Sequence, residues 1–282
     1  VTLAAEELHI TQSTASHALD RLRSILRDPL FVRSGRRIVP TTRAQRIEQK
    51  ALQLLEDMHA LTEPETFDPA TATGRITISA NDYEREMILT DVFREFRSQA
   101  PGVLLHIRDT GGQFEEDLRT RRTDLVLTPT PPAGTGELMI QKLMSDRMVS
   151  FYDPAVRTAP LDLQTYIDAP HALVSFADAE PSRTDQALAR LGHRRNIVYL
   201  APSFDGLPNF VRGTDILASL PAMLGGTLMQ DFAEHPLPFP TPDIEFRQIW
   251  HARDQHNPQH QWLRRLVHGI AEKLTSAQTG AG

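Results

Sequence analysis

The sequence predicts a multidomain α+β protein in which two short helices and a hairpin precede one long helix and two α/β lobes. Three observations predict this order. Apolar residues recur with helical spacing in the first quarter of the chain, turn-forming residues follow, and strand and helix patterns then alternate to the end. At 282 residues, the chain is long enough for two or three compact units.

The segment Thr11–Leu26 is predicted to be an amphipathic helix. A shorter apolar segment, 3–10, precedes it, and Thr11 is a residue type that caps helices, so a tight turn would join the two. A helix pair whose second member is polar on its outer face is typical of the DNA-binding helix-turn-helix. An ordinary amphipathic pair with a solvated face would look the same, so both interpretations remain open. The apolar stripe consists of Ala15, Leu19, Leu22 and Leu26, spaced by four, three and four residues.

Two strand-like runs, 30–33 and 37–39, flank Ser34 and Gly35 and predict a hairpin. Arginines gather on or beside it, as expected of a wing that contacts DNA phosphates. The first turns of the preceding helix would face base edges. The predicted DNA-binding residues are Thr11, Gln12, Ser13, Ser16 and His17 on the helix, and Arg33, Arg36 and Arg37 on the wing.

Charge is unevenly distributed along the chain. The first 50 residues contain nine Lys or Arg and five Asp or Glu, a net charge of +4, whereas the whole chain carries −6. A basic N-terminal unit on an acidic remainder is typical of a DNA-binding arm on a carrier domain, although chance clustering would give the same balance. We therefore expect double-stranded DNA as a partner.

A long helix is predicted from about Thr42 to Leu61. Its apolar residues are spaced alternately by three and four, which is a heptad pattern that asks for a partner helix. Pairing would hold two recognition helices at the fixed spacing that a two-fold operator requires. We expect this helix to pair with a second copy in a homodimer, and a single helix packed on its own domain is the alternative. The pattern consists of Ala44, Ile47, Ala51, Leu54, Met58 and Leu61.

A domain boundary is expected after this helix, because Glu63-Pro64 ends it and residues 66–74 are small or turn-forming. Strands and helices alternate from Gly74 onward, which implies parallel sheets. Two lobes joined by crossing strands, the architecture of periplasmic binding proteins, would result. The expected strands are 75–80, 103–108, 124–128, 138–144, 147–152, 172–175, 196–201, 216–220 and 244–251, and the expected helices are 84–98, 114–121, 183–191, 207–211, 222–229 and 257–274.

Ligands of open parallel sheets bind beyond the carboxyl ends of the strands, where helix N-termini offer free N–H groups. Amides, hydroxyls and aromatic rings at those ends suit a small, partly apolar effector, although each residue alone could be an ordinary cap or turn. The carboxylate of Asp82 would disfavour an anionic effector unless it were paired or protonated. The predicted effector-binding residues are Asn81, Asp82, Tyr83, Thr110, Thr128, Pro202, Ser203 and Phe204.

Several function classes find no support in the sequence. The absence of cysteine excludes disulfides, cysteine-ligated zinc and thiol nucleophiles, and no apolar run approaches the roughly 18 residues of a membrane span. From these two features we expect a cytoplasmic protein with no membrane partner. G-x-S-x-G, P-loop and H-E-x-x-H motifs are absent, so we do not expect an enzyme. His251, His256 and His260 come nearest to a metal site but lack a completing carboxylate. No metal and no cofactor are expected.

The stretch LAAEELHITQSTASHALDRLRSILRDPLFVRSGRRIVPTTRA resembles the winged helix-turn-helix of LysR-type transcriptional regulators. Within it, DPLFVR is similar to the branch that includes nodulation and aromatic-catabolism regulators. Farther along, APGVLLHIRDTGG, TDLVLTP and GTDILASLPAML resemble the effector domain of the same family. The resemblance implies a ligand-responsive transcription factor that pairs through its linker helix into a homodimer or homotetramer. It also implies a small-molecule effector between the lobes, and the branch points to an aromatic one.

The resemblance also implies domain bounds and two departures. The family usually has proline where Ser13 stands and a basic residue at or near His17, so base preference does not transfer. The family has a further helix before this pair, so we expect the sequence as given to lack that helix and to bind DNA poorly. A binding module of the same fold that no longer reads DNA is the alternative function. The expected domains are the winged helix-turn-helix at 1–42, the dimerisation helix at 43–63, a hinge at 64–73 and the effector domain at 74–282, with lobe I at 74–145 and 247–282 and lobe II at 146–246.

Overall fold

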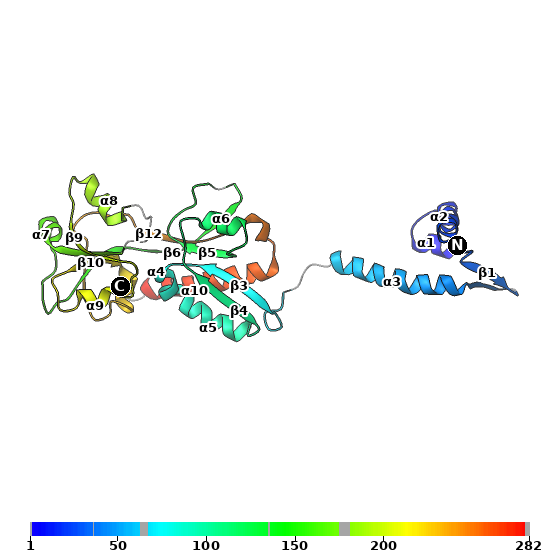
Figure 1. Cartoon of the computed structure of the whole chain (residues 1–282), viewed down its shortest axis with the longest axis horizontal. Coiled ribbons are helices and arrows are strands. Elements are labelled where there is room, and N and C mark those ends of the chain that lie inside the picture. Colours follow the sequence, from blue (N-terminus) through cyan, green and yellow to red (C-terminus); the bar gives the residue numbers. More distant parts are fainter. Residues whose placement is uncertain (1, 36, 63–66, 135, 175–180, 280–282) are drawn as a thin grey trace. The chain divides into compact units, whose positions relative to one another are not determined.

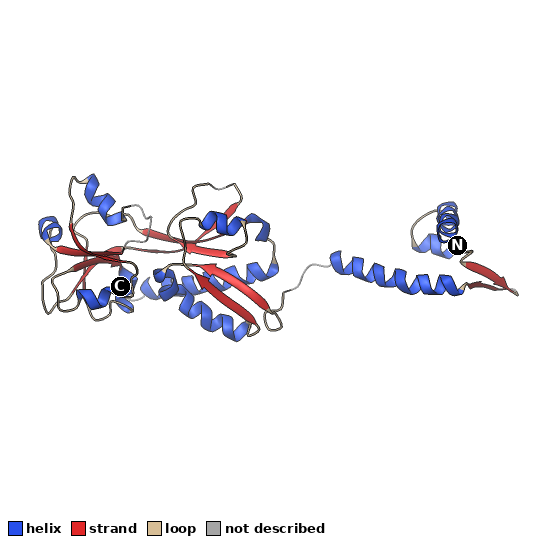
Figure 2. Ribbon diagram, viewed as in Figure 1, coloured by secondary structure: helices blue, strands red, loops and turns tan. Residues whose placement is uncertain are grey.

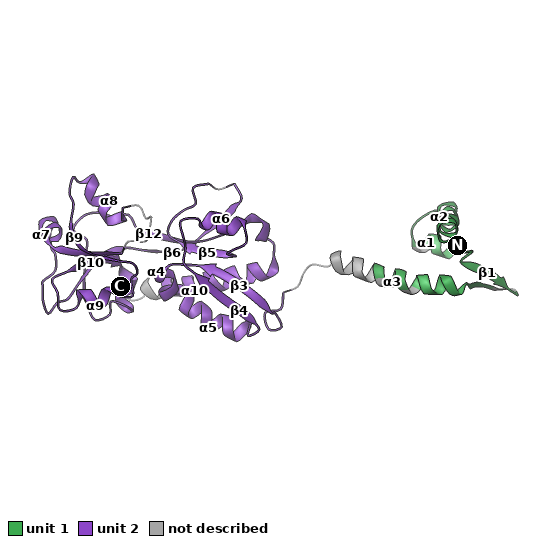
Figure 3. Ribbon diagram, viewed as in Figure 1, with its two compact units in different colours: residues 1–65 green, residues 66–282 purple. Residues whose placement is uncertain are grey.

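A computed structural model describes residues 2–35, 37–62, 67–134, 136–174 and 181–279. Residues 1–65 and residues 66–282 form two compact units, coloured green and purple in Figure 3. None of the helices in these described ranges combines the length and apolar content needed to cross a bilayer.

The first unit contains the predicted helix pair, hairpin and long helix (Figure 1). Gly35 turns the hairpin with a φ of +62°, a left-handed conformation that glycine adopts without a steric cost. Among the side chains that the structure describes in this unit, only Ala5 and Leu30 are buried, so much of its apolar surface is uncovered. The elements are α1 (Thr2–Glu7), α2 (Gln12–Leu26), β1 (Phe31–Ser34), β2 (Arg37–Pro40) and α3 (Thr42–Thr62).

The described part of the second unit contains two five-stranded sheets, one in each lobe. The lobe I sheet has the order β4-β3-β5-β12-β6, and the lobe II sheet has the order β11-β7-β10-β8-β9. The strands of lobe I are β3 (Gly74–Ser79), β4 (Val103–Arg108), β5 (Leu125–Thr128), β6 (Leu138–Asp146) and β12 (Ile244–His251). Those of lobe II are β7 (Met148–Tyr152), β8 (Pro170–Val174), β9 (Asn196–Ala201), β10 (Leu217–Pro221) and β11 (Ala233–Pro236).

Both sheets are mixed rather than purely parallel. Strand β3 is parallel to β4 and β5, and β8 is parallel to β9 and β10, which confirms the prediction from alternating strands and helices. In lobe I, β12 is antiparallel to both of its neighbours, β5 and β6, and in lobe II, β7 is antiparallel to both β10 and β11. Only Arg147 separates β6 from β7, so β6 leads directly into the second lobe.

Helices cover both faces of the lobe I sheet (Figure 2). Helix α10 packs against β6 and α5, and α6 packs against β5 and β12. On β5, Leu125 and Leu127 belong to the main core, whereas Val126 joins a separate cluster with Phe114 of α6, because successive residues of a strand face opposite sides. The helices are α4 (Asp82–Glu84), the π-helical turn η1 (Arg85–Leu89), α5 (Thr90–Gln99), α6 (Phe114–Arg119), α7 (Leu163–Asp168), α8 (Arg183–Arg190), α9 (Leu207–Val211), the 3₁₀ turns η2 (Ala222–Gly226) and η3 (Ala252–Asp254), and α10 (Pro258–Thr279).

The main core extends through both lobes. It includes Phe246 on β12 and Phe151 on β7, so the crossing strands are part of one apolar cluster rather than an exposed tether. The sequence patterns missed two elements of lobe II, α7 and β11. Both are short, with six and four residues, and too few positions repeat in them to establish a helical or strand period.

Candidate functional site

Helix α2 presents polar side chains at its beginning. Thr11 caps the helix, with extended backbone angles (φ −74°, ψ 152°) and a hydroxyl that accepts a hydrogen bond of 3.2 Å from the backbone N–H three residues later. Of the residues predicted to face base edges, Gln12, Ser13 and His17 are exposed and Ser16 is half-buried. The first turns of α2 are therefore accessible to a nucleic acid, although Ser13 shares a hydrogen bond of 2.9 Å with Thr11.

Asp28 fixes the base of the hairpin. Its Oδ1 accepts hydrogen bonds of 2.8 Å from the Thr41 hydroxyl and from the backbone N–H two residues later. The Thr41 hydroxyl is the main reason that the pKa of the Asp28 carboxyl lies below its usual range. Arg33 on β1 is exposed, as a phosphate contact requires. Arg36 and the side chain of Arg37 lie outside the described residues.

Helix α3 carries its predicted seam on an uncovered surface. Ala44 and Ile47 are half-buried, whereas Leu54 is 63% exposed within the unit. The side chains of Met58 and Leu61 lie outside the described part of the chain. An apolar side chain that is mostly exposed on a long helix favours contact with another surface.

Two predicted effector residues meet where β3 and β4 end. The side-chain oxygen of Asn81 accepts a hydrogen bond of 3.2 Å from the backbone N–H of Thr110. The Thr110 hydroxyl is buried and has no hydrogen-bond partner within the described residues. A buried polar atom without a partner is unusual in a folded protein, and a ligand is one way to satisfy it.

Two further predicted residues connect the lobes. Asp82, at the beginning of α4 in lobe I, accepts a hydrogen bond of 3.0 Å at Oδ2 from the backbone N–H of Phe204 in lobe II. Its Oδ1 forms an ion pair with Arg85. Asp82 is only 6% exposed, and it shares the guanidinium of Arg85 with Asp109.

Tyr83 holds the lobes together on the same side of the crossing strands. Its ring stacks on Phe246 of β12, with centroids 4.3 Å apart. Its hydroxyl donates to Asp146 Oδ2 at 2.7 Å, and the same oxygen accepts the backbone N–H of Met223 at 3.0 Å. Burial raises the pKa of the Tyr83 hydroxyl, so the donor keeps its proton. We call Tyr83, Phe246, Asp146 and Met223 the neutral latch, because the donors to its carboxylate, a tyrosine hydroxyl and a backbone N–H, are uncharged.

The remaining predicted residues are less closely connected to this group. Thr128 ends β5 and is 2% exposed, and its hydroxyl accepts a hydrogen bond of 3.1 Å from the N–H of Thr130 in its own loop. Pro202 is exposed and Ser203 is half-buried. The described hydrogen bonds thus join Asn81 to Thr110 and Asp82 to Phe204, and they leave Thr128 in its own loop.

A carboxyl group missed by the sequence prediction lies beneath this cluster. Glu84 is 1% exposed, and its Oε2 accepts a hydrogen bond of 3.2 Å from the N–H of Asn81, while its Oε1 has no partner within the described residues. Burial raises the pKa of Glu84 to about 8, and the hydrogen bond from Asn81 acts in the opposite direction. Glu84 is therefore mainly protonated at neutral pH.

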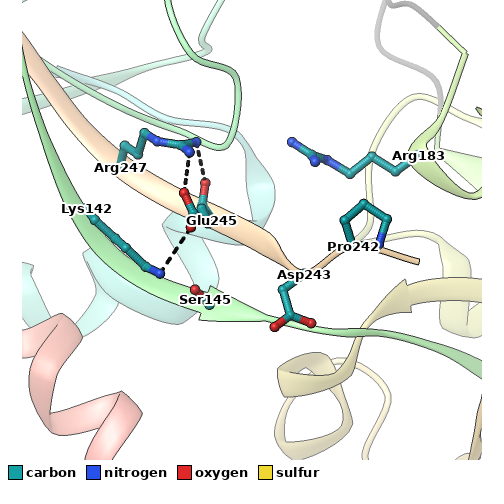
Figure 4. Close-up of a pocket in the computed structure, with 7 residues that line it drawn as sticks. All are labelled: Lys142, Ser145, Arg183, Pro242, Asp243, Glu245 and Arg247. Atoms are coloured by element: carbon teal, nitrogen blue, oxygen red, sulfur yellow. Dashed lines mark hydrogen bonds and ion pairs between the residues drawn. The ribbon is translucent and has the colours of Figure 1, made fainter. Parts of the chain in front are cut away.

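A charged pocket of about 360 Å³ lies on the other side of the crossing strands (Figure 4). Glu245 lies next to Phe246 on β12 and so faces away from the neutral latch. Lys142 Nζ lies 3.3 Å from Glu245, and Arg247 also pairs with Glu245. None of the eight predicted effector residues lines this pocket. Its lining is Lys142, Ser145, Arg183, Pro242, Asp243, Glu245 and Arg247.

A β-bulge explains how Lys142 reaches the pocket. Phe246 pairs with Met144 but Arg247 pairs with Lys142, so Leu143 is an extra residue on β6. A bulge redirects the side chains on one side of it. It brings Lys142 and Ser145 into the lining of the same pocket, although strict alternation would place them on opposite faces. The sequence contains one indication of this pocket. Residues 245 and 247 are both charged and lie two positions apart on a strand, so they share one face of it.

Comparison with known families matches both units of the chain. The LysR substrate binding domain matches residues 69–271, and the bacterial regulatory helix-turn-helix protein, lysR family, matches residues 1–45. The chain belongs to the LysR family of transcriptional regulators. LysR-type regulators bind DNA and small-molecule effectors and are not enzymes, which agrees with the predicted fold and function. The helix-turn-helix match favours this function over a binding module that does not read DNA.

Individual LysR-type relatives cover nearly the whole chain. The HTH-type transcriptional activator NahR of Pseudomonas putida is 29% identical over 95% of this chain and 91% of its own length. The HTH-type transcriptional regulator LinR of Sphingobium indicum is 31% identical over 96% and 91%. The solved structure of the probable transcriptional regulator PA0477 from Pseudomonas aeruginosa is 29% identical, with a TM-score of 0.63 over 95% of this chain and 90% of that one. Nodulation protein D 1 of Sinorhizobium fredii, 28% identical over 94% and 84%, belongs to the branch that the sequence resembles.

Proposed function

We propose that this LysR-type regulator reads a two-fold operator with α2 and senses a small aromatic effector where the strands of the two lobes end. The observation that carries the effector site is the buried, unpartnered hydroxyl of Thr110 beside the side-chain amide of Asn81. A ligand oxygen or N–H at this point would satisfy a hydroxyl that the described residues leave unpaired. A regulator of this kind meets its operator in the cytoplasm, so that location is part of the proposal.

The surroundings support an aromatic effector. Phe204, which is half-buried and donates its backbone N–H to Asp82, supplies aromatic surface at the strand ends, and the branch resemblance points to the same class of effector. Asp82 shares the guanidinium of Arg85 with Asp109, so two carboxylates face one cation, which favours a neutral effector over an anionic one. Glu84, held neutral by burial, adds no charge to the site.

Thr110→Val tests the effector site. The change keeps the shape of the side chain and removes the hydroxyl. Aromatic effectors should then bind at least about tenfold more weakly, because losing one hydrogen bond to a buried group costs about that much binding free energy. A thermal-shift panel of phenolics, aromatic acids and amino acids measures this, with operator binding by fluorescence anisotropy as the second readout. Thr90→Val, an exposed threonine on α5, is the matched control. A Thr110→Val protein that responds to the panel like wild type would place the effector elsewhere.

The operator-reading role rests on the accessible first turns of α2 and the exposed arginine of the wing. Arg33→Gln should weaken binding to all DNA sequences and reduce the salt slope by about one unit, because it removes one phosphate contact. Gln12→Ala should instead change sequence preference and leave the salt slope unaltered. Arg46→Gln on α3, also exposed, is the control. An Arg33→Gln protein that altered sequence preference alone would refute the assignment of roles.

Dimerisation through α3 completes the proposal. Leu52 and Leu54 are 54% and 63% exposed within their unit, and a partner helix would cover such side chains. Leu54→Asp would bury a charge in that seam and should dissociate the pair, with Glu48→Asp as an exposed control on the same helix. Light scattering reports the mass, and an unchanged oligomer would remove the paired-helix model.

The effector domains offer a second pairing surface, which would make a tetramer. Strands β4 and β9 are edge strands, and Leu104 and Leu200 on them are 62% and 61% exposed. Exposed apolar residues on sheet edges favour association with another chain. Leu104→Lys should then reduce a tetramer to a dimer in the same light-scattering experiment, whereas an unchanged tetramer would exclude this edge.

A further inference from the structure

We infer that the charged pocket binds an anion, in the form of a carboxylate or phosphate group, between Arg183 of lobe II and Arg247 and Lys142 of the crossing strands. This goes beyond the proposed effector contacts, because none of those residues lines the pocket.

The two arginines converge on one neutral atom. Arg183 Nη2 and Arg247 Nη1 each lie 3.3 Å from the carbonyl oxygen of Pro129. Figure 4 shows their guanidinium groups facing each other across the pocket from opposite walls. A carbonyl oxygen accepts hydrogen bonds from both but neutralises neither positive charge. Arg247 also pairs with Glu245, whereas no ion pair joins Arg183 to a carboxylate of the described residues, so an anion between the two guanidinium groups would supply the missing partner.

The carboxylates of the pocket do not meet this demand. Glu245 is shared by Lys142 and Arg247, and the hydrogen bond and charge of Lys142, together with the charge of Arg247, lower the pKa of its carboxyl. Among the residues drawn in Figure 4, Asp243 directs its carboxylate away from both guanidinium groups, and no ion pair joins Arg183 to any of them. Among the described residues that line the pocket, three are cations and two are carboxylates, so this part of the lining is net positive.

Partial burial of Arg247 strengthens the attraction between the positive lining and an anion. The side chain of Arg247 is only 22% exposed, so water screens its charge less than on an open surface. A planar guanidinium also matches a carboxylate or phosphate through two parallel hydrogen bonds. The volume of about 360 Å³ is within the range of small-ligand sites.

The protein also builds the positions of these cations. The start of α8, which carries Arg183, is fixed by Arg195, whose side chain is 1% exposed and whose Nε lies 2.7 Å from Asp185. Arg195 Nη2 also donates to the Ser182 cap at 3.2 Å. On the opposite wall, the bulge at Leu143 directs Lys142 into the pocket. Fixed cations on both walls bind an anion with less loss of side-chain freedom than mobile ones.

An anion in this pocket would act on the lobes. It would contact Arg183 of lobe II and Arg247 of the crossing strands at once, so it binds best when those walls are at one separation. By linkage, any effector that favours the same separation would bind more tightly with the anion present. The regulator would then have a second, charge-dependent input.

Titration calorimetry of the full chain at constant ionic strength tests the site. The probes are inorganic phosphate, benzoate and the neutral benzyl alcohol as a control. We expect at least one of the two anions to bind, and benzyl alcohol to show no dependence on the pocket residues. Phosphate alone would identify a phosphate group, benzoate alone a carboxylate, and failure of both anions would overturn the inference.

Charge variants of the pocket should change its affinity for the anion in opposite directions. Arg183→Gln and Lys142→Met should each weaken the bound anion at least about tenfold, whereas Glu245→Gln should strengthen it, because it removes the competing carboxylate. Arg94→Gln on α5, 72% exposed, should bind like wild type. If Arg183→Gln proves unfolded in a melting curve without ligand, Lys142→Met and Glu245→Gln carry the test. Equal affinities in wild type and Glu245→Gln, or in wild type and the cation variants, would contradict the site.

Discussion

The two sides of the crossing strands differ in how they satisfy their polar groups. On one side, the hydroxyl of Tyr83 and the N–H of Met223 both reach Asp146, and an aromatic stack covers them. On the other side, Arg183 and Arg247 meet at a carbonyl oxygen, and Arg247 alone of the two pairs with a carboxylate of the described residues, Glu245. The first side needs nothing further from its surroundings, and on the second the proposed anion would supply the carboxylate or phosphate partner that Arg183 lacks among the described residues.

This difference indicates that one side of the crossing strands fixes the arrangement of the lobes and that the other side binds a ligand. Buried, satisfied contacts stabilise the arrangement of the lobes, because breaking them leaves donors and acceptors unpaired. Exposed ion pairs add little to stability, because water already solvates both partners. This regulator therefore gains rigidity from the neutral latch, and the charged pocket has little effect on its free energy of unfolding.

The largest predicted effect is that of Tyr83→Ala. Removing the ring deletes the stack on Phe246 and the donor to Asp146, so the free energy of unfolding should fall by about 3–5 kcal/mol. Denaturant unfolding of the full chain, followed by circular dichroism, measures this. Phe93→Ala is the control, because that ring is 47% exposed, and it should cost less than about 1.5 kcal/mol. Similar losses in the two variants would mean that the latch has no special role.

Glu84→Gln is expected to have an effect that depends on pH. The pKa of Glu84 is raised in the folded protein to about 8 from an ordinary 4.5, so between these values the folded chain binds more protons than the unfolded chain. The contribution of Glu84 to the unfolding free energy is fully present below about pH 4.5 and falls as pH rises through this window, by at most about 1.4 kcal/mol per pH unit.

The Gln side chain stays neutral at every pH, so the variant should lose this decline. Unfolding curves at pH 5 and pH 8 measure the difference, and the variant should gain on wild type as the pH rises. Glu86→Gln, on the neighbouring π-helical turn, is the control. Parallel pH profiles of wild type and Glu84→Gln would show that Glu84 ionises normally.

The smallest expected effect belongs to the charged side. Lys142 and Glu245 are 55% and 43% exposed, so Lys142→Met without any anion present should change the unfolding free energy by less than about 1 kcal/mol. Differential scanning calorimetry in a buffer free of phosphate and carboxylates measures it. A loss as large as that of Tyr83→Ala would show that the charged side also holds the lobes.

Local patterns predicted much of the fold from the sequence. The bounds of β4, β9, β12 and α9 match the predicted ranges, because their apolar periods and breakers are clear. Thr11 caps α2 as predicted, since capping depends on neighbouring residues alone. The meeting of Asn81 with Thr110 rests on a general rule of parallel sheets.

The charged pocket could not be predicted in this way. Arg183 and Arg247 meet at Pro129 only because α8 and β12 pack against the same loop, and no sequence period encodes that. Strict alternation also gives the wrong face for Lys142, because the bulge at Leu143 has no signature in the sequence. Likewise, the unpartnered hydroxyl of Thr110 is a property of the folded site.

The most direct test of the whole account is a calorimetric comparison of Thr110→Val with Arg183→Gln, titrating each with a neutral aromatic effector from the thermal-shift panel and then with the bound anion. The account predicts a double dissociation. Thr110→Val should lose the aromatic effector and keep the anion, and Arg183→Gln should lose the anion and keep the aromatic effector. If either variant lost both ligands equally while remaining folded, the two sides of the crossing strands would form one site, and the account would be wrong.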